Sequence, residues 1–276
     1  MINLAIYAHF SSNSEVDDSV WNYLHALHDI GFEIFFVSNS PVSMNSNRRL
    51  SVICKNVLER PNIGLDFCMW KAALEIVELK SVEQLLLTNS SIVGPFYPLK
   101  PIFEEAKSWN CGFWGMTENS QYGRHLQSYF LVFEQEIINS SFFRKFWDSV
   151  LPLEDKYQII FSYELGLSNW MAQHGYAGRA FAPEPRIWAS YRASRSLLQL
   201  SAEVVRGKLM PPQDVTLEFP DFLIDAGMPF LKRSLLHMCS KRFTPEKANA
   251  LLDFHRKRET SGAAYANSQP TTFLKI

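Results

Sequence analysis

Short apolar runs alternate with helix-spaced apolar positions along the first half of the chain. Four runs rich in β-forming residues predict strands over residues 4–9, 33–37, 52–58 and 84–87. Between them, apolar residues recur every three or four positions and predict helices over residues 16–30, 66–79 and 101–106. Ser14 is a candidate cap for the first of these helices. This alternation is typical of an α/β sheet whose strands run mainly parallel.

The second half of the chain is less regular. Apolar runs predict strands over residues 112–116, 127–133 and 175–182, and helical spacing predicts helices over residues 142–150 and 159–173. Residues 229–259 carry eight Lys or Arg against three Asp or Glu, and an amphipathic helix is predicted from Thr244 onward. We therefore expect one α/β domain over residues 1–240, and a basic helix with a flexible tail over residues 241–276.

Composition excludes several classes of protein. Of the 276 residues, 47% are hydrophobic and 20% are charged, which excludes a disordered chain. The net charge of −1 argues against a dedicated nucleic-acid binder, which usually carries a basic excess. No signal peptide is visible, and no apolar stretch approaches the ~18 residues of a spanning helix. The four cysteines, Cys54, Cys68, Cys111 and Cys239, form no metal-binding pair. We expect reduced thiols and a cytoplasmic location.

Polar residues follow three of the predicted strands. His9 ends the first strand, Asn39 follows the second, and Thr88-Asn89-Ser90-Ser91 ends the fourth. In α/β sheets, ligands bind beyond the carboxyl ends of the strands. These side chains should therefore line one crevice.

A glycine and an aspartate open the helix predicted over residues 66–79. Gly64 permits a positive φ or a close backbone approach, and Asp66 suits either a helix cap or a contact with the ribose or base of a nucleotide. A turn followed by an ordinary cap explains the same residues.

The turn at residues 88–91 carries neutral donors and acceptors. No carboxylate lies between Glu83 and Glu104, and hard divalent cations prefer carboxylate oxygens. The turn is therefore a poor metal site, and a capped loop remains the alternative. A third polar cluster, Arg124-His125-Leu126-Gln127-Ser128, enters an apolar strand and suits a phosphate or a sugar, although a lone His is more often structural.

At these motifs the sequence resembles the rhamnan synthesis protein F family, and the similarity follows the chain in order over residues 4–236. The matching blocks lie at residues 4–10, 36–40, 62–67, 70–71, 85–87, 89, 94–95, 113–115, 125–131, 163–164, 167 and 227–232. The resemblance implies a GT-A-like fold, in which a nucleotide-binding α/β half joins an acceptor-binding half. It also implies a glycosyltransferase of cell-surface polysaccharide synthesis.

The resemblance further implies a nucleotide sugar donor, dTDP-rhamnose, and a lipid-linked glycan acceptor at the inner membrane face. The basic end of the chain suits that setting, because anionic lipid attracts each nearby Lys or Arg by about 1 kcal/mol. A solvated helix explains the same charges.

The family pattern assigns roles to individual residues. Those expected around the donor nucleotide are His9, Asn39, Asn62, Gly64, Asp66, Asn89 and Ser90. Those expected on the sugar or the acceptor are His125, Gln127, Ser128, Trp114 and Lys232. An inverting transfer needs a carboxylate base; the prediction is Glu164, with Asp66 as the alternative.

One position departs from the family. Family members usually carry an acidic residue where this chain has Ser90, and in many GT-A enzymes an acid at this turn binds the metal that holds the diphosphate. The departure predicts metal-independent catalysis, an altered donor or lost activity. Arg124 or Lys232 would replace a metal by hydrogen bonds to phosphate. A non-catalytic nucleotide-sugar or glycan-binding subunit, or a scaffold of an assembly complex, remains the alternative to an enzyme.

Overall fold

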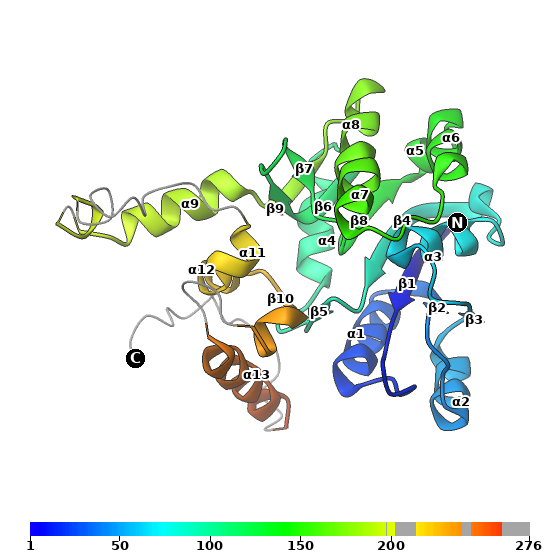
Figure 1. The fold of residues 1–276 in the computed structure, drawn as a ribbon, viewed down its shortest axis with the longest axis horizontal. Coiled ribbons are helices and arrows are strands. Elements are labelled where there is room, and N and C mark those ends of the chain that lie inside the picture. Colours follow the sequence, from blue (N-terminus) through cyan, green and yellow to red (C-terminus); the bar gives the residue numbers. More distant parts are fainter. Residues whose placement is uncertain (197, 202–213, 239–243, 261–276) are drawn as a thin grey trace.

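A computed structural model describes residues 1–196, 198–201, 214–238 and 244–260, and its centre is one large β-sheet (Figure 1). The strand order is β3-β2-β1-β4-β8-β6-β7, with β9 paired to β6. The strands are β1 (Ile2–His9), β2 (Phe32–Ser38), β3 (Asn56–Glu59), β4 (Val82–Asn89), β6 (Phe113–Asn119), β7 (His125–Leu126), β8 (Phe130–Glu134) and β9 (Arg179–Ala182). Neighbours from β3 to β4 are parallel, and β8 runs antiparallel to both β4 and β6. The predicted α/β class with a mainly parallel sheet is confirmed.

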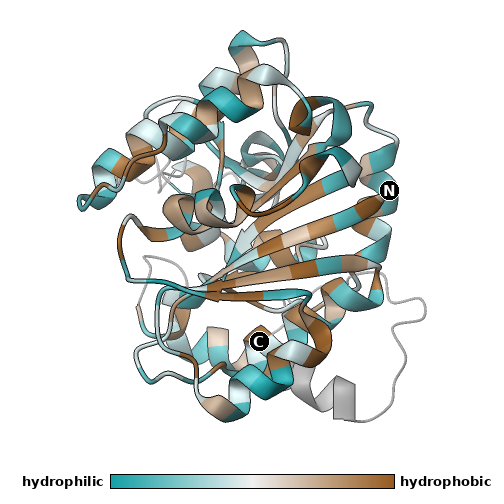
Figure 2. Cartoon of the chain, turned by 90° about the vertical axis from the view of Figure 1, so that its right-hand side faces the viewer, coloured by the Kyte–Doolittle hydropathy of each residue, from teal (hydrophilic) through white to brown (hydrophobic). Residues whose placement is uncertain are grey.

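Helices cover both faces of the sheet. Alternation along β1 sends Ala5 and Tyr7 into one hydrophobic core and Leu4, Ile6 and Ala8 into another. The first core contains residues of α1 (Asp18–Asp29), α4 (Lys100–Lys107) and α9 (Glu184–Ala193). The second contains residues of α3 (Leu65–Leu74), α5 (Gln135–Ile138), α6 (Ser141–Ser149), α7 (Lys156–Ile159) and α8 (Gly166–Gln173). Hydrophobic residues accordingly run along the central strands in Figure 2.

The C-terminal part folds back onto the sheet domain. After α11 (Val215–Glu218) and α12 (Pro220–Asp225), β10 (Leu231–Lys232) pairs antiparallel with β5 (Ile92–Val93). The predicted basic helix is α13 (Pro245–Thr260), whose Ala248 and Leu252 pack into a third core with Val93 and Phe96. The predicted tail and Cys239 lie outside the described residues, and the domain boundary at residue 240 stays a prediction. No helix within the described residues is both long and apolar enough to cross a bilayer.

Several predicted boundaries were wrong. Residues 44–53 form α2 (Met44–Ile53), so the strand predicted over residues 52–58 starts only at Asn56. The cap of α1 is Asp17, which accepts a hydrogen bond from the Val20 amide (3.0 Å), and not Ser14. Helix α3 ends at Leu74 rather than residue 79, and β9 starts at Arg179 rather than residue 175. The remaining predicted helices and strands are present within a few residues of their expected ends.

Two features of the second half have no counterpart in the predictions. The strand predicted over residues 127–133 starts only at Phe130, as β8, and residues 127–129 separate it from the short strand β7, which precedes the predicted range. The helix predicted over residues 159–173 contains a π-helix over Ile160–Leu165. Such π-helical insertions are rare, and they occur frequently at functional sites.

Candidate functional site

The ends of β1, β2 and β4 meet at one edge of the sheet, as the strand-end argument predicted. His9 Nδ1 lies 3.0 Å from Ser38 Oγ, and the Asn39 amide donates to the His9 carbonyl (3.0 Å). On the other side of β1, the Ser90 amide donates to the Ala8 carbonyl (2.9 Å). Burial lowers the pKa of His9 to about 4, so this imidazole is neutral at physiological pH. The three strand ends form one continuous polar edge.

Asn39 connects this edge to the loop before α3. Its side-chain Nδ2 donates to Asn62 Oδ1 (3.3 Å), and its Oδ1 accepts from Arg60 Nη1 (3.0 Å). Arg60 also donates to the Ile63 carbonyl (3.1 Å). Asn39 and Asn62 were expected in one site from the sequence, whereas Arg60, which fixes the loop between them, was not foreseen.

Gly64 has the conformation that the sequence analysis anticipated. Its φ is +74°, and a side chain there would collide with the Cys68 thiol and come within 3.1 Å of Pro152 Cα. Only glycine satisfies both the backbone angle and the space. Gly64 therefore sets the direction in which the chain enters α3 and presents Asp66.

Asp66 faces the turn after β4. Asn89 Nδ2 donates to Asp66 Oδ2 (2.8 Å), while Asn89 Oδ1 accepts from Ser91. Burial raises the pKa of Asp66 to about 6, against the lowering effects of the Asn89 hydrogen bond and the Lys232 charge. The negative charge of Glu164 adds to the rise. Asp66 is therefore a carboxyl that exchanges protons near neutral pH.

Glu164 is held by groups on both of its oxygens. Its Oε2 accepts from the Ser128 amide (3.0 Å) and from the Ser128 hydroxyl. Its Oε1 lies 3.3 Å from His125 Nε2, and His125 Nδ1 lies 2.8 Å from the Gly123 carbonyl oxygen. Since Nδ1 must donate to that carbonyl, a proton on Nε2 makes His125 an imidazolium paired with the carboxylate.

The charges of this pair reinforce each other. Although burial opposes both shifts, hydrogen bonds to His125 and Ser128 hold the pKa of Glu164 below its ordinary value. The hydrogen bond to Glu164 likewise raises the pKa of His125. The Glu164 side chain keeps 19% of its surface exposed, so the ion pair opens to solvent on one side.

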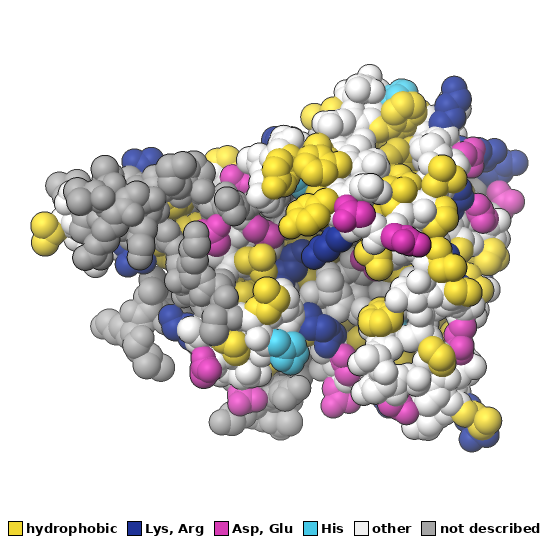
Figure 3. Space-filling model, in the orientation of Figure 1, with side chains coloured by type: hydrophobic (Ala, Val, Ile, Leu, Met, Phe, Trp, Pro, Cys, Tyr) yellow, Lys and Arg dark blue, Asp and Glu magenta, His cyan; other side chains and the backbone are white. Residues whose placement is uncertain are grey.

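Lys232 supplies positive charge near the carboxyl groups of Asp66 and Glu164. Its Nζ lies 4.8 Å from the centre of the Tyr129 ring, and its charge lowers the pKa of both Asp66 and Glu164. Among the described residues, the Lys232 ammonium has no hydrogen-bond or ion-pair partner, although its backbone pairs with β5. Basic and acidic side chains lie close together in the hollowed centre of the face in Figure 3. This arrangement suits the binding of an anion.

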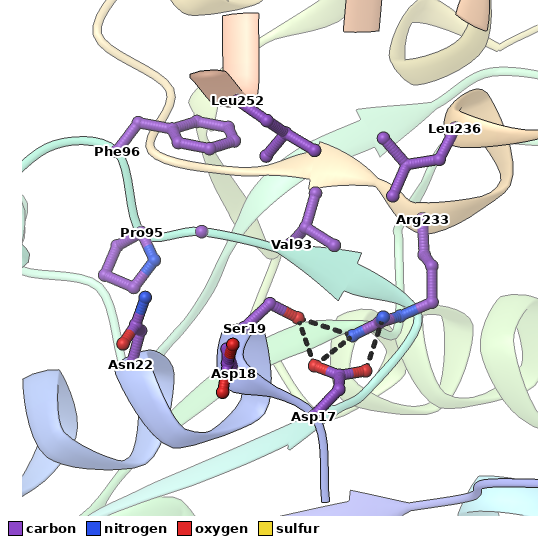
Figure 4. A pocket seen from close by; sticks show the side chains of 11 residues that line it. Asp17, Asp18, Ser19, Asn22, Val93, Pro95, Phe96, Arg233, Leu236 and Leu252 are labelled. Carbon is purple, nitrogen blue, oxygen red and sulfur yellow. Dashed lines mark hydrogen bonds and ion pairs between the residues drawn. The ribbon is translucent and has the colours of Figure 1, made fainter. Parts of the chain in front are cut away.

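Arg233 braces the turn after β4 from its other side. Its Nε donates to the Ser90 carbonyl (2.8 Å), and its Nη1 pairs with Asp17 (2.7 Å) (Figure 4). Its Nη2 donates to Ser19 Oγ (2.7 Å). Asp17, Ser19 and Arg233 border a cavity of about 280 Å³, which Leu252 of α13 also lines. Lys232 was foreseen from the sequence and its neighbour Arg233 was not, although two adjacent basic residues were the available signal.

Two of the named residues lie elsewhere or are already engaged. Trp114 is 1% exposed and packs edge-on against Phe103 and Trp109 in the core, so it has no face open to a sugar. Arg124 pairs with Glu118 (2.7 Å) and donates to the Gly178 carbonyl, away from the turn after β4. The expectation that Arg124 replaces a metal at that turn was therefore wrong.

Gln127 belongs to a buried network behind Tyr129. It accepts from Thr117 Oγ1 (2.6 Å) and donates to Asp214 Oδ2 (3.2 Å). Asp214 was not foreseen, because it precedes α11 in a stretch with no recognisable motif. Its negative charge contributes to the raised pKa of His125.

The turn that holds Ser90 does not fit a carboxylate-held cation. Asp66 is the carboxyl beside Asn89, whereas Asn89 and Ser90 are neutral and a divalent cation prefers several carboxylate oxygens. In the part of the chain that the structure describes, no group of three or more His, Cys, Asp or Glu could hold a metal. Positive charge at this turn comes instead from Lys232 and Arg233.

Comparison with known proteins gives a family match and distant relatives. The model of the family described as rhamnan synthesis protein F matches residues 34–184, more than half of the chain. The virulence protein VirA of Vibrio anguillarum is 26% identical over 221 residues, which cover 74% of this chain and 69% of VirA. The uncharacterized protein y4gN of Sinorhizobium fredii is 26% identical over 174 residues, covering 60% of this chain and 45% of y4gN.

Similar solved structures are more distant in sequence. A Bacillus anthracis protein, provisionally assigned as a glucose-1-phosphate thymidylyltransferase, has a TM-score of 0.46 and 7% identity, covering 65% of this chain and 86% of its own. Residues 1–349 of S. aureus TarS have a TM-score of 0.36 and 12% identity, covering 50% of this chain and 48% of TarS. These likenesses are partial, and the fold class given above is defined by the strand order.

Proposed function

Because the chain belongs to the rhamnan synthesis protein F family, we propose that it is a glycosyltransferase that uses a nucleotide sugar. The proposed reaction moves a deoxysugar, rhamnose, from dTDP-rhamnose to a growing cell-surface polysaccharide. The observation that carries the proposal is the charge cluster of Asp66, Lys232 and Glu164 at the carboxyl edge of the sheet. It combines a cation for the diphosphate with two carboxyl groups for proton transfer.

The proposed donor site follows the edge formed by β1, β2 and β4. His9, Asn39, Asn62, Gly64 and Asp66 surround the nucleoside, and Asn89 and Ser90 lie near the diphosphate. The proposal is supported by the hydrogen bonds that join Asn39 to Asn62 and Asn89 to Asp66. Lys232 then binds the diphosphate through charge-assisted hydrogen bonds. Arg233 keeps the turn in place from behind.

We assign the role of general base to Glu164. A base must be ionised and must reach the acceptor hydroxyl. The lowered pKa keeps this carboxylate charged at neutral pH, and its remaining exposed surface faces solvent. His125, Gln127 and Ser128 belong to the same sugar or acceptor side. Asp66 is the second candidate, because its pKa of about 6 is closer to the pH at which proton transfer is most effective.

The proposed enzyme works without a divalent cation. Ser90 stands where the family pattern has an acidic residue, and the two basic side chains at the turn supply the charge that a metal would otherwise give. A non-catalytic nucleotide-sugar or glycan-binding subunit is the second candidate function, and Ser90 is the observation that favours it. The acceptor in the proposal is a lipid-linked glycan, reached from the cytoplasm at the inner membrane face with help from the basic C-terminal segment.

A thermal-shift panel tests the donor proposal. The purified chain is measured with dTDP, UDP, GDP, their sugars and dTDP-rhamnose, each with and without Mg²⁺ or Mn²⁺. A ligand at ~100 times its dissociation constant stabilises the folded state by about 2.7 kcal/mol. We expect dTDP and dTDP-rhamnose to raise the unfolding midpoint as much without metal as with Mg²⁺ or Mn²⁺. If no nucleotide shifts the midpoint, the proposed donor site is wrong. If dTDP-rhamnose binds but is neither hydrolysed nor transferred, the chain is a non-catalytic binding subunit and not an enzyme.

A further inference from the structure

Two exposed aromatic rings lie on the chain segments that carry the His125–Glu164 pair. Tyr122 is 59% exposed and Phe161 is 45% exposed, and their ring centres lie 4.9 Å apart at an interplanar angle of 54°. On the face drawn in Figure 3, hydrophobic side chains gather over the region of β7 and α7, next to acidic and basic groups. Large aromatic residues usually bury their surface, so an exposed pair at a charged site suggests a ligand.

The backbone holds both rings on the segments that carry the ion pair. Tyr122 has φ +64°, a left-handed conformation that bulky residues rarely adopt. The next residue, Gly123, provides the carbonyl to which His125 Nδ1 donates (2.8 Å). Phe161 lies in the π-helix, three residues before Glu164. Both rings are therefore fixed by the irregular segments that position His125 and Glu164.

We propose that Tyr122 and Phe161 form a stacking platform for a pyranose ring of the acceptor saccharide, beside Glu164. The inference rests on the proposed glycosyltransferase function and assigns its acceptor subsite. A pyranose ring has C–H groups on its faces and hydroxyl groups at its edge. The negative faces of aromatic rings attract such C–H groups, while Glu164 and Ser128 are polar groups that can orient the hydroxyls.

The small size of the platform favours a sugar over a protein partner. A stable protein interface buries roughly 800 Å² on each side, far more than two rings offer. A small set of rings with nearby polar groups is instead the composition of a site for a small ring-shaped ligand.

Ligand-observed NMR on the full chain tests the platform. The probe is methyl α-L-rhamnopyranoside, titrated against wild type with dTDP present, and the measured quantities are saturation transfer to the sugar protons and the dissociation constant. We expect saturation to concentrate on the C–H protons of one ring face. Tyr122→Ala and Phe161→Ala should each weaken binding by about two- to tenfold, the range of one aromatic contact.

Conservative variants separate ring stacking from general hydrophobicity. Tyr122→Phe retains the ring and should bind like wild type, whereas Phe161→Leu retains an apolar side chain and should bind like Phe161→Ala. Ile76→Ala is the matched control, because Ile76 is 58% exposed and lies two residues after the end of α3. Equal binding by wild type and both alanine variants overturns the platform. So does a loss of phosphatidylglycerol vesicle binding in these variants with unchanged sugar affinity, which would make the rings a membrane contact.

The two proposals fail in different ways. If wild type neither binds dTDP nor hydrolyses dTDP-rhamnose, the glycosyltransferase proposal fails, whatever the saccharide titration shows. If wild type hydrolyses dTDP-rhamnose but the alanine variants bind the probe normally, the acceptor platform alone fails. An equal loss of dTDP and sugar affinity in Tyr122→Ala also overturns it, because the ring would then support the site as a whole.

Discussion

The two sides of the proposed site are built in different ways. The donor side consists of the ends of β1, β2 and β4, and its polar groups bond to one another through regular strand geometry. The acceptor side consists of a π-helix, a left-handed Tyr122 and the short strand β7, and its central feature is an ion pair. The donor side is thus preformed by the sheet, whereas the acceptor side depends on irregular segments and charge.

The largest expected effect separates the two sides by removing the proposed base. Glu164→Gln should lower turnover by about 10²- to 10⁴-fold, the usual contribution of a general base, and leave the dTDP dissociation constant within about twofold. Single-turnover rates and isothermal titration measure the two quantities. Glu154→Gln, at an exposed position before α7, is the matched control and should change neither. Full turnover with weakened dTDP binding would move Glu164 to the donor side.

The pH dependence of the reaction distinguishes the two candidate bases. If Asp66 takes the proton, kcat/KM should fall about tenfold per pH unit below about 6, the pKa to which burial raises this carboxyl. If Glu164 takes the proton, kcat/KM should stay constant down to below pH 4.5, because hydrogen bonds lower the pKa of this carboxyl group. We expect the second profile. The same profile in Asp66→Asn would confirm that Asp66 does not carry the reaction.

A pair of glycine variants tests how tightly the donor side is built. Gly64 and Gly175 both have a positive φ, but a Cβ at Gly64 collides with Cys68, whereas a Cβ at Gly175 has no atom within 4 Å. Gly175→Ala should lower the free energy of unfolding by about 1 kcal/mol from backbone strain alone. Gly64→Ala should lower it by about 2 to 4 kcal/mol, since overpacking adds to the strain. Equal losses in urea denaturation would show that the close approach at Gly64 is unimportant.

The meeting of the ends of β1, β2 and β4 at one edge was the part that the sequence could predict. His9, Asn39 and Asn89 follow apolar runs of strand period, and parallel strands bring their carboxyl ends to one edge. Helix α2 was missed because only Ser46 and Leu50 are buried along it, which leaves almost no apolar periodicity. A helix or strand can therefore be predicted well from the local sequence only where it buries apolar residues at regular spacing along one face.

The acceptor side could be predicted only in part. The resemblance named His125, Ser128 and Glu164, but neither the π-helix nor the left-handed Tyr122 leaves a periodic signal. Arg233 reaches Ser90 across a sequence separation of 143 residues, so its role depends on the tertiary fold. Trp114 was wrongly expected at the site because its strand β6 is buried along its whole length, on both faces, which a sequence block does not reveal.

Lys232 joins the two sides, and its removal should affect both. Lys232→Met should weaken dTDP binding by about ten- to a hundredfold, the strength of a charge-assisted hydrogen bond to phosphate. It should also raise the pKa of Asp66, because the lysine charge lowers it. Titration calorimetry measures the affinity, and NMR of the carboxyl carbon follows the pKa. Lys80→Met, at an exposed position, is the control; a Lys232→Met variant that binds dTDP normally would place the diphosphate elsewhere.

A small effect is also expected from the ion pair of the acceptor side. The raised pKa of His125 adds stability that is complete below pH 6.5 and is lost as the pH rises through the folded-state value. The lowered pKa of Glu164 adds stability that is complete above pH 4.5 and is lost as the pH falls through its folded-state value. Both contributions coexist between pH 4.5 and 6.5.

The difference in unfolding free energy between wild type and His125→Gln isolates the contribution of the ion pair. Other groups, such as Asp66, titrate in both proteins, so their effects cancel in the difference. The wild type should exceed the variant in unfolding free energy by about 1.5 kcal/mol within the window from pH 4.5 to 6.5, and by less at pH 9. Urea denaturation at a series of pH values gives the difference directly. A difference that stays constant from pH 5 to pH 9 would mean that His125 is held neutral, and the contrast between an acceptor side built on an ion pair and a donor side built on strand ends would disappear.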